Sequence, residues 1–183
     1  MKNCFIKLNK LSADDMIKIW KITLDSTKEN LWEKRISTRT AIAPNRHHLE
    51  SKYNSTDNRD LKVYWNEEME FITNLILPDN MKEFVSSQDM NMIPPFHEMD
   101  IHIDDHRDAL IYLPIYPIKE DYMPMRYYHN NEEILLDNHD IGQVYLCNAK
   151  IIHRIHNNSD LPRYNYQISL KGKEYENMLY QIT

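Results

Sequence analysis

The C-terminal half of the chain consists of short segments that alternate between apolar and polar residues, and this pattern most limits how the chain can fold. From Pro94 onward the segments are separated by Asn, Asp and Pro residues, with no helical periodicity between them. They span residues 97–104, 109–116, 122–128, 133–136, 143–147, 151–156 and 164–170. Short, closely spaced strands without intervening helices are typical of antiparallel sandwiches and barrels. The pattern therefore predicts a jelly-roll β core over residues 94–170.

Two helices are expected before this core. Ser12 is a favourable N-cap and Asp15 lies three residues later, so the helical spacing of the apolar residues that follow predicts a helix from about 13 to 26. A second periodic segment predicts a helix from about 66 to 77. It should end before Pro78, because the residue that precedes a proline is disfavoured in helical conformation.

The remainder of the N-terminal part is less regular. Residues 61–65 alternate as a strand does, whereas the polar stretch 38–60 has no clear period and is expected to form a loop or lid. We expect residues 1–93 to pack on the β core as a mixed, largely helical part. The chain of 183 residues would then be a single domain, mainly β with N-terminal helices.

Composition excludes several classes of function. The formal net charge is −6 and basic residues are scattered, which disfavours a nucleic-acid partner. The chain contains only two glycines, Gly142 and Gly172, so the glycine-rich loops of Rossmann and P-loop nucleotide sites are not expected. No segment has the length and apolar character of a membrane span or a signal peptide, and the expected location is the cytoplasm, without membrane association.

The β core contains two His-x-Asp pairs, which are candidate metal ligands. Side chains two residues apart on a strand point to the same face, so each pair would place an imidazole beside a carboxylate. His102 and Asp104 lie in the alternating segment, whereas His106 and Asp108 fall in a charged stretch that must turn before the next strand. Non-haem iron oxygenases bind their metal through two histidines and one carboxylate. The first pair is the better candidate, and a distant histidine must supply the third ligand.

The segment that could supply this histidine carries a more specific pattern. Gly142 opens a strand, His153 follows, Asn157 lies four residues further in a His-x-x-x-Asn arrangement, and Arg163 lies ten residues after the histidine. This order resembles the double-stranded β-helix of the iron(II)- and 2-oxoglutarate-dependent oxygenases. It is most similar to the branch that contains the aspartyl/asparaginyl hydroxylases and the free-proline hydroxylases. The resemblance covers roughly residues 94–170.

The resemblance implies a catalytic centre in which His102, Asp104 and His153 hold Fe(II). It also implies that Arg163 binds 2-oxoglutarate. The co-substrate would chelate the metal through its keto-acid end and leave its second carboxylate for the protein, and a planar guanidinium can bind a carboxylate through two parallel hydrogen bonds.

One position departs from the family pattern. The family often has a small hydroxyl residue two places after the arginine, whereas this chain has Asn165. The second co-substrate contact is therefore open between Asn165, Tyr112 and Tyr127. Arg107 lies where the family often carries an arginine near the substrate, and it is either a substrate contact or a solvated loop charge.

The function implied by the resemblance is hydroxylation of a free amino acid or of a residue in a peptide. A carboxylate ligand at Asp104 favours hydroxylation over halogenation, since a halide would need the position that the carboxylate occupies. Two other functions stay open. One is a cupin-type metal-binding protein that does not use 2-oxoglutarate, and the other is a non-catalytic β-sandwich that serves in binding or assembly.

Overall fold

The computed structural model describes residues 4–34, 62–97, 101–104, 106–116, 125–130, 132–136 and 142–182. The expected loop or lid over residues 38–60 lies outside these ranges. None of the described helices is long and apolar enough to cross a membrane.

The described residues form two antiparallel sheets. The large sheet has seven strands, in the order β1-β8-β5-β10-β4-β3-β2, and the small sheet has three, in the order β7-β6-β9. In chain order the strands are β1 (Phe5–Lys10), β2 (Glu33–Lys34), β3 (Lys62–Tyr64), β4 (Val85–Ile93), β5 (Ala109–Tyr116), β6 (Met125–His129), β7 (Glu132–Leu136), β8 (Gln143–Asn148), β9 (Ile152–Arg154) and β10 (Arg163–Leu170).

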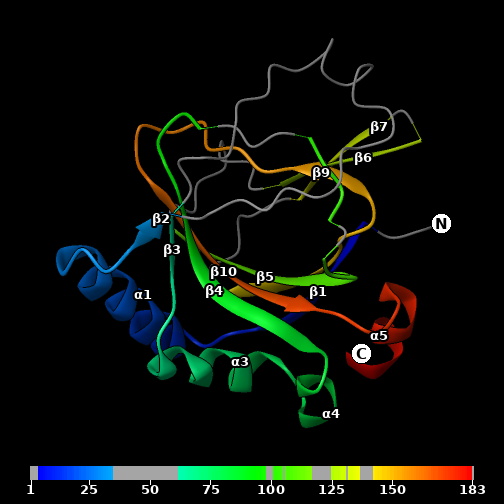
Figure 1. The fold of residues 1–183 in the computed structure, drawn as a ribbon, viewed down its shortest axis with the longest axis horizontal. Helices are drawn as coiled ribbons and strands as arrows, with labels where there is room; N and C mark the ends of the chain where they lie inside the picture. The colour runs from blue at the N-terminus through cyan, green and yellow to red at the C-terminus, as the bar shows by residue number, and fades with distance from the viewer. Residues whose placement is uncertain are drawn as a thin grey trace.

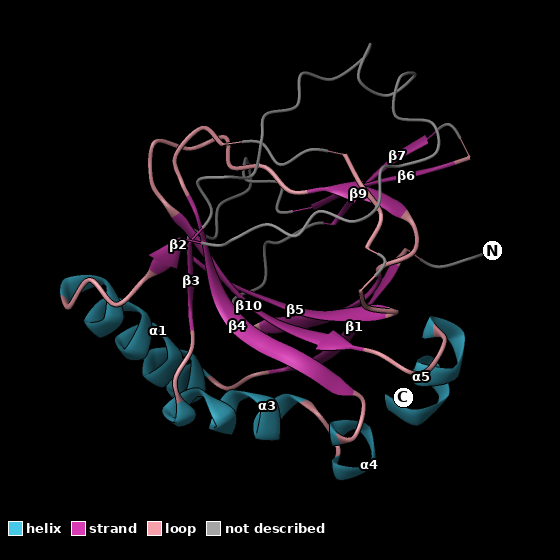
Figure 2. Cartoon of the chain, in the orientation of Figure 1, coloured by secondary structure: helices cyan, strands magenta, loops and turns pink. Residues whose placement is uncertain are grey.

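The helices and the small sheet lie on opposite sides of the large sheet, as Figures 1 and 2 show. The helical segments are α1 (Ala13–Lys28), η2 (Glu67–Met69), α3 (Glu70–Ile76), α4 (Asp79–Lys82) and α5 (Tyr175–Ile182). The large sheet is therefore covered on both faces, and all eight residues of its central strand β10 are buried.

Alternation along β10 separates two cores. Tyr166 and Ile168 belong to the apolar cluster that includes Met16 and Ile19 of α1, on the helical side of the sheet. A second cluster fills the space between the two sheets. It contains Ile93, Leu110, Tyr112 and Tyr145 from the large sheet and Met125, Tyr127 and Leu136 from the small sheet. The residues of β10 that face the space between the sheets are polar: Arg163, Asn165, Gln167 and Ser169.

Several elements occur where the sequence predicts them. Helix α1 begins after Ser12, whose side-chain oxygen accepts a hydrogen bond from the Asp15 amide over 3.1 Å. The predicted second helix is divided into η2 and α3, which both fall within residues 66–77. Strands β5, β8 and β10 match three predicted strands to within one residue at each end.

Other elements were not predicted or differ from the prediction. Strands β1 and β4 and helix α5 were not expected, so the large sheet takes strands from both halves of the chain. Polar residues interrupt the pattern of β4, which reads Val-Ser-Ser-Gln-Asp-Met-Asn-Met-Ile, and hide its strand character. The predicted strand at 97–104 contributes, among its described residues, only an isolated bridge at His102.

Gly142 lies directly before β8 and contacts the segment that leads into α1. It adopts a φ of +79°, and its carbonyl accepts a hydrogen bond from the Leu11 amide over 2.9 Å. A Cβ atom at this position would lie 2.9 Å from the Leu11 carbonyl oxygen and 3.2 Å from Cγ of Met16. Both the backbone conformation and the close approach therefore require glycine.

We predict that Gly142→Ala lowers the free energy of unfolding by roughly 2–4 kcal/mol, because the strain of a positive φ adds to a backbone clash. Urea unfolding would measure this loss. Gly172→Ala is the matched control, since its φ is +95° but the nearest atom to an added Cβ is 3.9 Å away. Equal losses in the two variants would contradict the role assigned to the Leu11 contact.

Candidate active site

Three residues from two distant segments converge at one end of the space between the sheets. His102 and His153 pair as an antiparallel bridge, with N–H···O distances of 3.0 Å and 2.9 Å in the two directions. Nε2 of His102 lies 3.7 Å from Oδ1 of Asp104, and Nε2 of His153 lies 3.5 Å from Oδ2 of the same carboxylate. All three ligand atoms lie within 4.8 Å of one another. Two imidazoles and one carboxylate at this spacing could hold a divalent metal ion.

Asp104 is fixed by its backbone as well as by its carboxylate. Its amide donates to the Ala149 carbonyl over 3.0 Å, and its own carbonyl accepts from Nζ of Lys150 over 3.0 Å. The residue is 5% exposed. Burial alone would raise the pKa of the Asp104 carboxyl, but Arg107, His153 and His102 hold that pKa well below its usual value. Asp104 is thus ionised and positioned beside both histidines.

The ring of His153 is oriented so that one nitrogen faces the carboxylate. Nδ1 lies 2.8 Å from the Ile151 carbonyl oxygen, which can only accept, so Nδ1 carries a proton and Nε2 is the ring nitrogen that faces Asp104. Tyr127 packs beside the ring, with 5.5 Å between the ring centroids. A histidine held in this way is typical of a metal ligand.

The second His-x-Asp pair, His106 and Asp108, does not join the cluster of His102, Asp104 and His153. The side chain of His106 is 47% exposed, although its Nδ1 lies 4.0 Å from Oδ1 of Asp104. Asp108 accepts from the Gly172 amide over 2.9 Å and lies 3.5 Å from Nζ of Lys150, so it anchors the turn before β5. The structure therefore brings the first pair, and not the second, together with His153.

Arg163 is buried between the two sheets. Its guanidinium donates to the His156 carbonyl over 2.8 Å and to the hydroxyl of Tyr112. Burial lowers the pKa of Arg163, and the contact with Tyr112 opposes this effect. His156 is buried, and burial together with nearby arginines lowers its pKa to about 4. A neutral His156 thus supports Arg163 through its backbone.

The loop between β9 and β10 is organised by Asn157, the residue that the His-x-x-x-Asn pattern singled out. Its amide nitrogen donates to the carbonyls of Ile93, Pro94 and Leu161 over 3.2, 2.9 and 2.7 Å. Its oxygen accepts from the amide and hydroxyl of Ser159 over 3.1 and 2.8 Å. These bonds tie the entry of β10 to the end of β4, so they determine where Arg163 begins its strand.

The face of β10 that carries Arg163 is a row of buried polar side chains. Asn165, Gln167 and Ser169 follow at alternate positions. Asn165 is fully buried, and neither its Nδ2 nor its Oδ1 has a hydrogen-bond partner among the described residues. A buried amide without partners is costly, by about 1–3 kcal/mol, and such groups mark places where a ligand or water completes the bonding. Sequence reasoning identified Asn165 only through its distance from Arg163.

Arg107 connects this row to Asp104. Its Nε donates to Oδ2 of Asp104 over 2.6 Å, and its Nη1 lies 3.3 Å from Oε1 of Gln167 and 3.2 Å from Oγ of Ser169. The residue is 5% exposed, so its interpretation as a solvated loop charge is wrong. A contact between Arg107 and a substrate stays a prediction.

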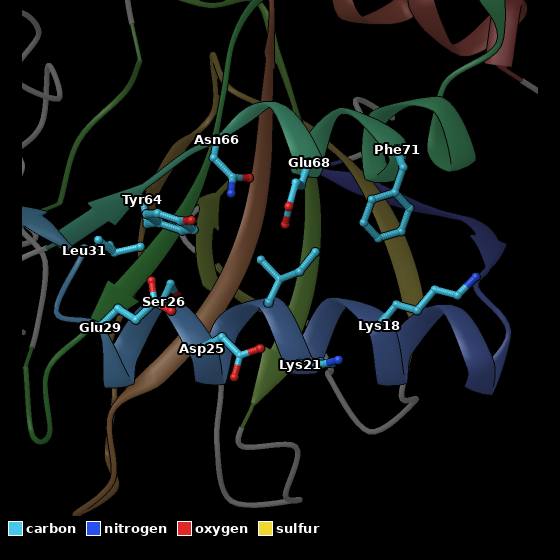
Figure 3. Close-up of a pocket in the computed structure, with 11 residues that line it drawn as sticks. Lys18, Lys21, Asp25, Ser26, Glu29, Leu31, Tyr64, Asn66, Glu68 and Phe71 are labelled. Atoms are coloured by element: carbon cyan, nitrogen blue, oxygen red, sulfur yellow. The ribbon is translucent and has the colours of Figure 1, made fainter.

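A separate hollow of about 620 Å³ lies between α1 and the segment that runs from β3 through η2 to α3 (Figure 3). Lys18, Lys21, Glu29 and Glu68 line it with charges of both signs, and Phe71 closes part of one side. It contains none of the three convergent ligands, and it belongs to the helical side of the large sheet. It is therefore distinct from the candidate active site.

Comparison with known proteins gives a fold but no close relative. No protein-family model matches the chain, and no curated protein matches it in sequence. Solved structures do match. A prolyl hydroxylase from Trichoplax adhaerens, solved with a hypoxia inducible factor peptide fragment, superposes with a TM-score of 0.69 at 12% identity, covering 97% of this chain and 87% of its own.

Two bacterial structures agree with this likeness. A Pseudomonas putida prolyl-4-hydroxylase has a TM-score of 0.65 at 13% identity, with 93% of this chain and 94% of its own covered. An oxidoreductase of the 2OG-Fe(II) oxygenase family from Burkholderia pseudomallei has a TM-score of 0.60 at 10% identity, covering 91% and 84%. The predicted double-stranded β-helix, mainly β with N-terminal helices, is thereby confirmed.

We predict that Asn157→Ala lowers the free energy of unfolding by roughly 2–4 kcal/mol, because three carbonyls and two donors lose a buried partner. Chemical denaturation would measure this loss. Ser159→Ala removes only the hydroxyl from the same network and should cost about 1 kcal/mol. A loss in Asn157→Ala no greater than that in Ser159→Ala would show that the loop does not depend on the amide.

Proposed function

We propose that this protein is an iron(II)- and 2-oxoglutarate-dependent oxygenase that hydroxylates an amino acid or a residue in a peptide. The observation that carries the proposal is the convergence of His102, Asp104 and His153 in a space whose wall also holds the buried Arg163. The two sets are linked through the cluster between the sheets, since Tyr112 contacts Arg163 and Tyr127 contacts His153.

The triad fits iron(II) in its donor types. Two neutral imidazoles and one carboxylate on one side of a metal ion leave other positions for a co-substrate and oxygen, which is the arrangement of non-haem iron oxygenases. The carbonyl of Ile151 accepts from Nδ1 of His153 and so leaves Nε2 as the nitrogen available to a metal, and Arg107 holds one carboxylate oxygen of Asp104. These contacts orient the ligands before a metal binds.

Arg163 suits the distal carboxylate of 2-oxoglutarate. A buried guanidinium beside a tyrosine hydroxyl offers several donors in a region that excludes water, where a charge-assisted pair is strong. Asn165 and Tyr112 are the residues we assign to the second contact. The Tyr127 hydroxyl instead bonds to the thiol of Cys147, which makes it the weaker candidate.

The protein's share of the chemistry is to bind, orient and exclude water. When bound, iron and 2-oxoglutarate together supply oxidation by molecular oxygen, with 2-oxoglutarate leaving as succinate and carbon dioxide. The triad holds the metal at one end of the space between the sheets and Arg163 sets the direction of the co-substrate. The aromatic cluster that includes Tyr127 and Tyr145 keeps this space dry.

The substrate class rests on the resemblance and on the matched structures. Two of these are described as prolyl hydroxylases, and one of them was solved with a peptide fragment. The net charge of −6 also suits a small or peptide substrate better than nucleic acid. We keep Arg107 as a candidate substrate contact because of its place in the family pattern, although its guanidinium already contacts Asp104, Gln167 and Ser169.

We predict that manganese(II), as a redox-inert substitute, and then 2-oxoglutarate each raise the unfolding temperature of the wild type. A ligand at 100 times its dissociation constant stabilises a fold by roughly 2.7 kcal/mol, or about 5–11 °C for a chain of this size. His102→Ala should lose the metal shift, and Arg163→Ala should keep it but lose the 2-oxoglutarate shift. Anaerobic thermal unfolding would measure both.

The outcomes separate the other functions. A metal shift with no response to 2-oxoglutarate would favour a cupin-type protein that does not use the co-substrate. The absence of any shift in the wild type would favour a non-catalytic β-sandwich. Either result would contradict the proposed oxygenase.

We predict opposite effects of Asn165→Leu on stability and on binding. The substitution removes an unpartnered buried amide, so the ligand-free protein should gain about 1–2 kcal/mol in the free energy of unfolding. The shift with 2-oxoglutarate should fall, because the ligand loses a hydrogen bond. Denaturant unfolding and 2-oxoglutarate titration of the manganese form would measure the two effects.

Asn91→Leu is the control for that experiment. Asn91 lies directly opposite Asn165 on β4, but its amide donates to Asp89 over 2.5 Å. The control should lose stability and keep the response to 2-oxoglutarate. A loss of stability in Asn165→Leu with an unchanged 2-oxoglutarate shift would mean that Asn165 is structural.

A further inference from the structure

Arg107 makes contacts that the proposed function alone does not explain. Its guanidinium lies against the carboxylate of Asp104 on one side and against two β10 side chains, Gln167 and Ser169, on the other. The side chains of Arg107 and Asp104 are 6% and 5% exposed, so solvent does not screen the pair. A buried ion pair with a 2.6 Å contact cannot rotate freely, so the neighbouring side chains fix the orientation of both groups.

The contact fixes the orientation of the carboxylate. Nε of Arg107 binds Oδ2, which also lies 3.5 Å from Nε2 of His153, whereas Oδ1 lies 3.7 Å from Nε2 of His102. Each carboxylate oxygen has two lone pairs, so the hydrogen bond leaves both oxygens able to face a metal but holds the plane of the group. A carboxylate without this contact would be free to rotate away from the two histidines.

We infer that Arg107 is a positioning residue that holds the Asp104 carboxylate in its orientation toward His102 and His153 and fixes this candidate metal ligand to β10, the strand that carries Arg163. The inference rests on the proposed function only in requiring that the triad binds a divalent metal. The anchoring follows from Nη1, which lies 3.3 Å from Oε1 of Gln167 and 3.2 Å from Oγ of Ser169. Through these contacts the metal ligand and the co-substrate arginine share one rigid support.

A purely electrostatic role would act in the opposite direction. A guanidinium close to a divalent cation repels it, so removal of the charge alone would strengthen metal binding. Outer contacts that orient a ligand usually contribute a factor of about 10–100 in metal affinity or activity, and their loss weakens binding. The sign of the change in metal affinity therefore separates orientation from simple charge.

The test measures cobalt(II) affinity by competition with a chelator, together with the visible absorption of the bound cobalt, which reports its coordination. The full chain is used as wild type, Arg107→Met, Arg107→Lys and Ser169→Ala. Arg126→Met is the matched control, because Arg126 forms an ion pair of the same 2.6 Å length, but with Glu133 on β7 and not with a candidate metal ligand.

We expect Arg107→Met to weaken cobalt binding about 10–100-fold and to change the cobalt spectrum. Arg107→Lys should recover part of the affinity, because it keeps a donor for Asp104. Ser169→Ala should lose less than Arg107→Met, and Arg126→Met should retain wild-type affinity and spectrum. If Arg107→Met does not fold, the lysine and serine variants carry the same test.

Tighter or unchanged cobalt binding in Arg107→Met would overturn the positioning role and leave the proposed function intact. If Arg107→Met does not fold, unchanged binding in both Arg107→Lys and Ser169→Ala would do the same. Equal losses in Arg107→Met and Arg126→Met would also overturn it, because the effect would then belong to general stability. A wild type that does not bind cobalt at all would overturn this inference together with the proposed function.

Discussion

The arrangement of the site depends on the burial of the Asp104 carboxylate between three cationic or potentially cationic side chains. A carboxylate that is 5% exposed is costly unless it is paired and hydrogen-bonded, and Arg107 at 2.6 Å supplies that partner. The bridge between His102 and His153 brings both imidazoles to the same carboxylate. The folded chain therefore has a preorganised set of three candidate metal ligands, with the low-pKa carboxylate of Asp104 at its centre.

Strand β10 connects this centre to the rest of the molecule through its two faces. One face joins the apolar cluster under the helices, and the other is a polar row that begins at Arg163 and ends at the contacts of Arg107. Because β5 and β4 flank the strand on either side, its register is fixed along its whole length. A polar row this deeply buried is expensive, and a binding site would account for it.

Sequence reasoning brought the residues of the candidate site together better than it placed the outer strands of the fold. Alternation predicted that His102 and Asp104 share one face, and the family resemblance singled out Arg163, which the structure buries. It did not find β1 or β4. The polar residues of β4 disguise a strand that hydrogen bonds to β10 define. β1 is an edge strand that its pairing with the distant β8 defines. It also could not find the buried Arg107–Asp104 pair or the unpartnered Asn165 amide. Arg107 and Asp104 are only three residues apart, but Arg107 also contacts Gln167 and Ser169, about 60 residues further along the chain. The Asn165 amide is buried because β4 and β5 flank β10 on either side.

The central claim is that the triad and Arg163 form one site in which 2-oxoglutarate chelates iron(II). Visible absorption of the anaerobic protein with both ligands tests it most directly, since a 2-oxo acid that chelates iron(II) through its keto and carboxylate oxygens gives a charge-transfer band. The account predicts this band in the wild type, its loss in His153→Ala, and a higher 2-oxoglutarate requirement in Arg163→Lys. A wild type that binds iron(II) and 2-oxoglutarate without developing the band would contradict the account.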